Sequence, residues 1–192
     1  MTAEFKTFTK IGRLRRDVVI TEKIDGTNGV VWISESLTEI RAGSRNRWLT
    51  SVKGDDNHGF GMWVEKHAGV LIGLGPGYHY GEWWGCGIAR GYDLTEKRWS
   101  LFNPRHYQFA VFAREQGAAV YTTPILYTGP FADQRVTEQL EELRANGSVA
   151  SPGYMHPEGV VVFHTANGAL FKVTLEHDEK PKGSTEPVRE MA

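Results

Sequence analysis

The strongest constraint on the fold is a tight turn between two apolar runs near the end of the chain. Residues 159–164 and 169–175 are rich in β-branched and aromatic side chains, and Asn167-Gly168 lies between them. Asn-Gly favours the two-residue turns of antiparallel hairpins, in which both central residues need a positive φ angle. Further strand-like runs do not alternate regularly with helices; they cover residues 18–21, 30–33, 38–41, 107–113 and 118–127. The sequence therefore predicts an α+β fold with mainly antiparallel sheets.

Two segments have the spacing of helices. Apolar residues recur with helical periodicity over 57–71, where Asp56 or Asn57 would be the N-cap. A second helix is predicted to begin at Asp133 and to end at Asn146-Gly147. The 192 residues, 40% of them hydrophobic, are most simply one domain over 1–192, with a loose charged tail at 177–192.

The composition excludes several classes of protein. No apolar run has the roughly 18 residues of a membrane helix, and the first residues lack the apolar core of a signal peptide, so we expect no membrane association and a cytoplasmic location. The single cysteine, Cys86, excludes an internal disulfide and a cysteine-rich zinc site. The net charge of −1 gives no long-range attraction to nucleic acid, so any such contact depends on local basic clusters.

Two basic clusters are candidates for that contact. Arg13, Arg15 and Arg16 form the first, and Arg41 with the following AGSRNR segment, which contains Arg45 and Arg47, forms the second. On charge alone, each is better explained as a solvated loop than as a nucleic-acid contact.

Four motifs in a fixed order carry the chemical signal. The first is Lys23-Ile24-Asp25-Gly26, which by itself is compatible with an ordinary hairpin. Glu82 follows within YGEWWG, Glu158 within PEGVVV, and Lys172 within LFKV. Each has a structural explanation alone, such as a strand lysine whose stem covers apolar surface. Together, the four motifs have no common structural explanation. The sequence also lacks the phosphate-binding loops of P-loop and dinucleotide-binding proteins.

This series resembles the covalent nucleotidyltransferase superfamily of ATP-dependent polynucleotide ligases and capping enzymes. EKIDGTN, AGSRNR and YGEWWG are most similar to the RNA ligase branch, and the resemblance extends over about residues 21–182. It implies a nucleotidyltransferase (adenylation) domain with two mainly antiparallel β-sheets flanked by helices and without a C-terminal OB domain.

The resemblance implies that Lys23 attacks the α-phosphate of ATP and retains AMP on its nitrogen. A free lysine has a pKa near 10.4, so a cation close by, either Lys172 or Mg²⁺, would favour the neutral amine. Asp25 would orient the lysine or bind metal-associated water, and Glu158 would act through Mg²⁺ or Mn²⁺. Lys172 would neutralise charge on the α-phosphate. The implied catalytic residues are thus Lys23, Asp25, Glu158 and Lys172.

Other residues would each bind a different part of the nucleotide. The resemblance assigns ribose hydroxyls to Glu82 and ribose or phosphate to Arg45. It assigns stacking on adenine to Phe112, with Phe109 as the second choice. Glu22 would help read the base, and Gly26 would let the backbone approach the nucleotide. The implied nucleotide-binding set is Glu22, Lys23, Ile24, Gly26, Asn28, Arg45, Glu82, Phe112, Glu158 and Lys172.

The later steps would transfer AMP to the 5′-phosphate of RNA or nicked nucleic acid and seal it to a 3′-hydroxyl. The terminal motif of many relatives has a second lysine where this chain has Thr174, so either Lys180 or Lys182 replaces it or the later steps differ. The near-neutral charge favours a partner protein that helps to hold the substrate. Two alternatives stay open: a minimal DNA ligase or nick sealer, and a nucleotide-binding module that joins no strands.

Overall fold

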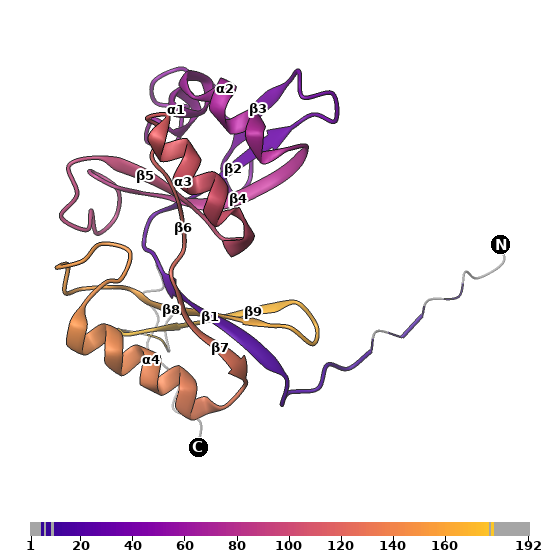
Figure 1. Ribbon diagram of the computed structural model, residues 1–192, viewed down its shortest axis with the longest axis vertical. Coiled ribbons are helices and arrows are strands. Elements are labelled where there is room, and N and C mark those ends of the chain that lie inside the picture. The colour runs from indigo at the N-terminus through magenta and orange to yellow at the C-terminus, as the bar shows by residue number, and fades with distance from the viewer. Residues whose placement is uncertain (1–4, 6, 9, 177, 179–192) are drawn as a thin grey trace, which may run out of the picture.

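Two β-sheets, joined at a narrow junction, form the framework of the protein (Figure 1). The computed structural model describes residues 5, 7–8, 10–176 and 178. One sheet has the strand order β3-β2-β4-β5-β6 and the other has the order β7-β1-β8-β9. All neighbouring strands are antiparallel except β5 and β6. The predicted α+β fold with mainly antiparallel sheets is therefore confirmed.

The bounds of the strands are as follows. The five-stranded sheet contains β2 (Thr27–Ile33), β3 (Ile40–Gly43), β4 (Gly77–Gly85), β5 (Lys97–Leu101) and β6 (Val120–Thr122). The four-stranded sheet contains β1 (Asp17–Lys23), β7 (Ile125–Pro130), β8 (Gly159–His164) and β9 (Ala169–Thr174). The hairpin predicted from Asn167-Gly168 is the β8–β9 pair.

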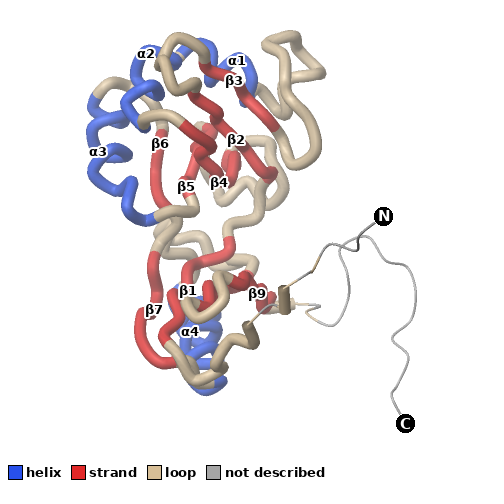
Figure 2. The backbone as a smooth tube through the Cα atoms, turned by 90° about the vertical axis from the view of Figure 1, so that its right-hand side faces the viewer, coloured by secondary structure: helices blue, strands red, loops and turns tan. Residues whose placement is uncertain are grey.

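Helices cover one face of each sheet (Figures 1 and 2). The helices α1 (Phe60–Lys66), α2 (Ala68–Leu71) and α3 (Tyr107–Glu115) pack on the five-stranded sheet, and α4 (Asp133–Asn146) packs on the four-stranded sheet. Single 3₁₀ turns, η1 (Ile72–Leu74) and η2 (Pro104–His106), follow α2 and precede α3. In the described part of the chain, no helix is long and apolar enough to cross a membrane.

The two predicted helices agree with the structure to different degrees. The helix α4 has the predicted bounds. The segment 57–71 is instead two short helices that meet at His67, and it starts after Gly59, whose φ angle is 89°. The tail 177–192, with Lys180 and Lys182, lies outside the described residues apart from residue 178, and the assignment of 1–192 to one domain stays a prediction.

The strand predicted over 107–113 is wrong, because this segment is α3. The Asn103 side chain accepts a hydrogen bond from the backbone N–H of Arg105, and Pro104 occupies the first position of the turn that leads into the helix. Ala110 and Ala113, three residues apart, are fully buried against the sheet. A short apolar run fits a buried strand and a buried helix equally well, so the burial pattern decided the outcome.

The run predicted as one strand over 118–127 is split between the sheets. β6 ends at Thr122, the chain crosses at Thr123-Pro124, and β7 begins at Ile125. A second crossing, Ile24 to Gly26, connects β1 to β2. It lies next to the first crossing, because the N–H of nearby Glu22 donates to the Pro124 carbonyl (3.0 Å). The two crossings form the junction between the sheets, visible edge-on in Figure 2.

Candidate active site

Lys23 is the last residue of β1 and lies at this junction. Its Nζ atom is 2.6 Å from Oε2 of Glu158, the residue immediately before β8. The Glu158 side chain is only 6% exposed and that of Lys23 is 21% exposed. The sequence motifs of Lys23 and Glu158, 135 residues apart, are therefore in direct contact. The contact is with an anion, not with the cation expected beside Lys23.

Glu82 approaches the same point from the other sheet. Gly26 packs beneath β4 so closely that a β-carbon on it would lie 2.5 Å from the Trp83 carbonyl oxygen. The Gly26 N–H donates to the Glu82 carboxylate, whose charge interacts with those of Lys23, Glu158 and Asp25. Burial raises the pKa of Glu82 to about 7, although Lys23 opposes that shift. The glycine of the first motif thus permits contact with β4, whereas the sequence suggested contact with the nucleotide.

Gly159 positions Glu158 by a similar close approach. Its φ angle is 151°, and a β-carbon there would lie 2.2 Å from the Val173 carbonyl oxygen on β9. The Leu175 N–H also donates to the Glu158 carbonyl oxygen (2.9 Å). Only glycine allows β9 to pack this tightly beside the glutamate.

Lys172 lies on the same face of the four-stranded sheet as Lys23. Lys172 pairs with Val161 on β8, and Val161 pairs with Thr21 on β1, so these side chains project from the same face. Lys23 is two residues after Thr21 on β1 and therefore projects from that face as well. Two strand spacings separate Lys172 from β1, about 10 Å in all. Lys172 is therefore placed to reach a ligand over this face and not to touch Lys23.

Thr174 is level with Lys23 across the sheet, since both residues pair with Gly159. The Thr174 hydroxyl lies within hydrogen-bond distance of the Glu176 carbonyl (2.9 Å) and of the Asp178 carboxylate (3.2 Å). The position at which many relatives have a lysine thus holds a hydroxyl that contacts the following turn.

Asp25 is held by residues that the sequence gave no reason to select. Its carboxylate accepts a hydrogen bond from Arg90 Nε (3.2 Å), and its N–H donates to the Tyr92 hydroxyl (2.9 Å). Tyr92 is fully buried, and Arg90 also donates to the His156 carbonyl. Both belong to the loop between β4 and β5, which has no residue pattern that marks it as part of a site. Tyr92 and Arg90 thus fix the backbone and side chain of Asp25, two residues from Lys23.

The side chains of Glu22 and Ile24 point away from the Lys23 face. The buried Glu22 carboxylate accepts hydrogen bonds from the Ser148 hydroxyl (2.6 Å) and from the backbone N–H groups of Val149 and Ala150. Burial raises the pKa of Glu22 and these hydrogen bonds oppose the shift. Ile24 is buried in a small core with Trp84 and Tyr92. The Glu22 side chain therefore anchors a loop, which is not the base-reading role expected of it.

Phe112 cannot stack on a nucleotide beside Glu82, because α3 lies on the opposite face of the five-stranded sheet. That face is packed with Trp99, Leu101 and the buried alanines of α3. Phe102 follows β5 directly, and its N–H donates to the Tyr80 carbonyl (2.9 Å). Strand alternation places Phe102 on the face of Ser100 and Glu82, which pair directly, and it is 43% exposed. The alternation in RWSLF was the sequence signal for this strand.

Arg45 and Asn28 lie on the Glu82 side of the sheet. Asn28 pairs with Glu82 in the β2–β4 register. Arg45 belongs to a turn after β3 and lines a depression of about 300 Å³ together with Val30 and Tyr80. Arg13, Arg15 and Arg16 precede the other end of β1, about 20 Å from Lys23. The structure brings the second basic cluster near the site and leaves the first cluster remote from it.

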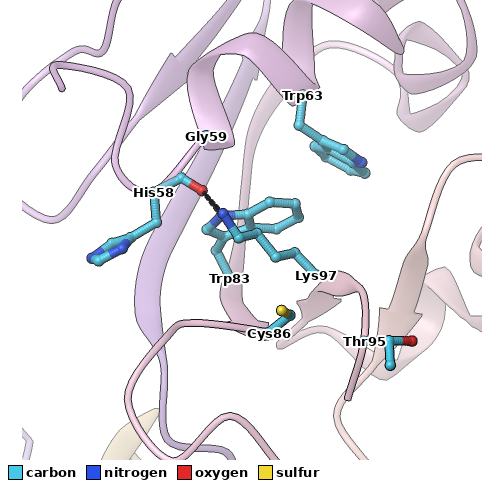
Figure 3. A pocket seen from close by; sticks show the side chains of 7 residues that line it. All are labelled: His58, Gly59, Trp63, Trp83, Cys86, Thr95 and Lys97. Carbon is cyan, nitrogen blue, oxygen red and sulfur yellow. Dashed lines mark hydrogen bonds between the residues drawn. The ribbon is translucent and has the colours of Figure 1, made fainter. Parts of the chain in front are cut away.

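A separate depression of about 390 Å³ lies beside Trp63 and Trp83 (Figure 3). Lys97 Nζ donates to the His58 carbonyl there (2.7 Å), and Cys86 and Thr95 complete its rim. It includes none of the residues that the sequence singled out for the active site.

A divalent metal fits this site only together with a ligand. Among the described residues, no group of three or more His, Cys, Asp or Glu side chains is arranged to hold a metal ion. Glu158 and Glu82 nevertheless supply carboxylate oxygens beside Lys23, and Mg²⁺ is commonly bound through one or two carboxylates plus substrate phosphates.

Comparisons with known proteins identify the family and the fold. The family profile described as RNA ligase matches residues 16–174, most of the chain. A search of curated protein sequences gives no significant match.

Solved structures of Naegleria gruberi RNA ligase share the fold. A mutant with ATP and Mn has a TM-score of 0.62 at 17% identity, over 84% of this chain and 50% of that chain. A mutant with AMP and Mn has a TM-score of 0.63 at 18% identity, over 88% of this chain and 53% of that chain. The chain thus spans about half the length of these proteins. With the motifs of Lys23, Glu82 and Glu158 meeting at one junction and a family match over residues 16–174, the chain belongs to the RNA ligase family.

Proposed function

We propose that this chain is the adenylation part of an ATP-dependent RNA ligase in which Lys23 forms a covalent lysyl-AMP intermediate. The observation that carries the proposal is the contact of Lys23 with Glu158 at a junction where Glu82 arrives from the second sheet. ATP and AMP in the Naegleria gruberi structures support a nucleotide at the corresponding fold position.

The first step is nucleophilic attack by Lys23 Nζ on the α-phosphorus of ATP. The N–P bond forms, the bond from that phosphorus to the β-bridging oxygen breaks, and pyrophosphate leaves. Glu158, 2.6 Å from Nζ, accepts the proton that the amine loses. In the absence of nucleotide this contact is an ion pair, so the ammonium gives one proton to Glu158 before it attacks, and the second proton passes to solvent as the N–P bond forms.

The remaining residues position the nucleotide over the Lys23 face. Glu82 accepts hydrogen bonds from ribose hydroxyls, Arg45 contacts ribose or phosphate, and Lys172 neutralises the α-phosphate. Phe102 replaces Phe112 as the aromatic ring that stacks on adenine. A magnesium or manganese ion, held by phosphate oxygens and Glu158, with Asp25 through water, would stabilise negative charge on the phosphates.

The later steps join the strands. AMP passes from Lys23 to the 5′-phosphate of an RNA, with cleavage of the N–P bond. A 3′-hydroxyl then attacks that 5′-phosphate, the new phosphodiester forms, and AMP leaves. Such an activity suits RNA repair in the cytoplasm, with a partner protein supplying part of the substrate contact.

Intact-protein mass spectrometry after incubation with ATP and Mg²⁺ tests the first step. We expect a mass gain of one AMP, reversed by pyrophosphate, and no gain for Lys23→Ala. Lys66→Ala removes an exposed lysine at the end of α1 and should behave as the wild type. An adduct that persists in Lys23→Ala, or a wild type that binds ATP without an adduct, contradicts the proposal.

Glu158→Gln tests the proton acceptor. The carboxamide keeps the shape but accepts no proton, so the rate of AMP uptake should fall by roughly 100-fold or more. Single-turnover rates at saturating ATP separate this effect from weaker binding. A rate equal to that of the wild type would remove Glu158 from the chemical step.

The strand that is joined is tested with nicked duplexes that have RNA or DNA on the 3′-hydroxyl side. Sealing of RNA ends supports an RNA ligase, and sealing restricted to all-DNA nicks would replace it with a DNA nick sealer.

A further inference from the structure

Four aromatic side chains form an exposed cluster beside the proposed nucleotide site, and the proposed function assigns them no role. We call Trp32, Trp48, Tyr78 and Tyr80 the aromatic platform. Tyr78 and Tyr80 belong to β4, Trp32 to β2, and Trp48 follows the turn after β3. Trp48, Tyr78 and Tyr80 are 44%, 55% and 54% exposed. Large apolar rings gathered on an open surface indicate an interaction site more often than isolated ones do.

The rings of the platform are held in a fixed order. The Tyr78 ring is nearly parallel to that of Tyr80 (6.2 Å between centroids, 14°) and to that of Trp48 (6.3 Å, 23°). Trp32 contacts both Trp48 and Tyr78, each at 6.4 Å. A Gly43–Trp48 bridge closes the turn that carries Trp48. The platform is therefore arranged before any partner binds, which lowers the entropic cost of binding.

The platform is continuous with the candidate active site. Tyr80 is two residues from Glu82 on β4, so both side chains project from the same face. Tyr80 is also opposite Phe102, the ring proposed to stack on adenine. A chain that leaves the active site along this face meets Tyr80, then Tyr78, then Trp48.

Arginines surround the platform. Arg45 and Arg47 line the depression of about 300 Å³ next to Trp48, Tyr78 and Tyr80. Within the described chain Arg45 forms no ion pair, whereas Arg47 pairs with Asp55. The Arg41 guanidinium lies over Trp32, 5.8 Å from the ring centroid. Arg41 is itself paired with Glu39, so of these three arginines Arg45 provides the local attraction for an anionic chain in a protein whose net charge is −1.

We propose that the aromatic platform binds unpaired nucleotides of the RNA next to the end that is joined. Exposed rings flanked by arginines are the combination by which proteins hold single-stranded nucleic acid, with bases on the rings and phosphates near the cations. A paired base cannot offer its face to such rings, because its neighbours in the helix cover it. This inference rests on the proposed function and adds that the substrate is a single-stranded end, in preference to a fully paired nick.

The test measures binding of a fluorescein-labelled, 5′-phosphorylated oligouridylate by anisotropy, alone and annealed to its full complement. The full chain should bind the single strand more tightly than the duplex. Tyr78→Leu should weaken binding of the single strand roughly tenfold, the loss typical of one stacked base, and Tyr78→Phe should retain most of it. Tyr107→Leu removes a similarly exposed ring, 56% exposed on α3, and should have no effect.

A second measurement needs no variant. The single strand should quench the fluorescence of the exposed Trp48, while Trp83, Trp84 and Trp99 are buried and should be unaffected. If Tyr78→Leu does not fold, Tyr80→Leu takes its place. Equal affinity for duplex and single strand, or unchanged binding by the leucine variant, overturns the platform and leaves this surface to a protein partner.

AMP uptake by the wild type, measured in parallel, separates the two proposals. Uptake together with unchanged binding by Tyr78→Leu overturns the platform alone. A wild type without uptake overturns the proposed adenylation, whatever the oligonucleotide does.

Discussion

The two faces of the five-stranded sheet have similar aromatic residues in opposite environments. On the helix-covered face, Phe60, Trp63, Trp83 and Trp99 pack with centroids 5.1–5.9 Å apart. On the open face, the rings of the aromatic platform are 6.2–6.4 Å apart. Alternation along a single strand, β4, supplies residues to both faces. The same residue types thus stabilise the fold on one face and are available to a ligand on the other.

The buried face should show the largest effect on stability. Trp99 is fully buried, contacts Phe60 and Trp63, and donates to the Gly29 carbonyl (3.2 Å). Trp99→Ala should lower the free energy of unfolding by about 3–5 kcal/mol, because it leaves a cavity under the helices. Urea denaturation measures the change. A loss below about 1 kcal/mol would mean that this face is not the main core.

Substitution of Glu82, on the open face, should have an intermediate effect on stability, and this effect should depend on pH. Its pKa is about 7 in the folded protein against 4.5 when unperturbed, so the folded state binds more protons between these values. Stability is therefore favoured by low pH and is lost as pH rises from 4.5 through about 7. Glu82→Gln cannot ionise, and relative to the wild type it should gain up to about 3 kcal/mol above pH 7.

Denaturation of the wild type and Glu82→Gln at several pH values checks this window. Glu65→Gln, on the exposed side of α1, controls for the loss of one negative charge. A difference between wild type and Glu82→Gln that does not vary with pH would show that burial does not disfavour the charged carboxylate.

The aromatic platform should show the smallest effect on stability. Tyr78→Ala removes a ring that is already 55% exposed, so the free energy of unfolding should change by no more than about 0.5 kcal/mol. Measured beside Trp99→Ala, it gives the contrast between the two faces directly. A loss comparable to that of Trp99→Ala would mean that the platform is a structural cluster.

Local patterns were sufficient for much of the fold and for the choice of the candidate reactive groups. The β8–β9 hairpin forms where Asn167-Gly168 predicted one, although its loop is the four residues 165–168 and the positive φ angle is at Gly168. The helix α4 has the predicted bounds, because an N-terminal Asp133 and a C-terminal Gly147 are local signals. Lys23 and Glu158 were selected as chemically related, and they are 2.6 Å apart.

Contacts between residues far apart in the sequence determined the remaining features of the fold and of the candidate site. Whether 107–113 became a strand or a helix depended on burial of Ala110 and Ala113 against the sheet, and this excluded Phe112 from the site in favour of Phe102. Glu22 is adjacent to Lys23 in sequence, yet strand alternation turns its side chain toward the loop at Ser148.

The sequence by itself therefore determined which side chains are proposed to carry the chemistry and where turns and hairpins form, because those depend on residue type and on neighbours along the chain. Only the tertiary structure decided which face each side chain occupies, that Arg90 and Tyr92 support Asp25, and that the aromatic platform stays open beside Glu82. The physical reason is that burial is set by elements far apart in the sequence, such as the crossings that place Gly26 under β4.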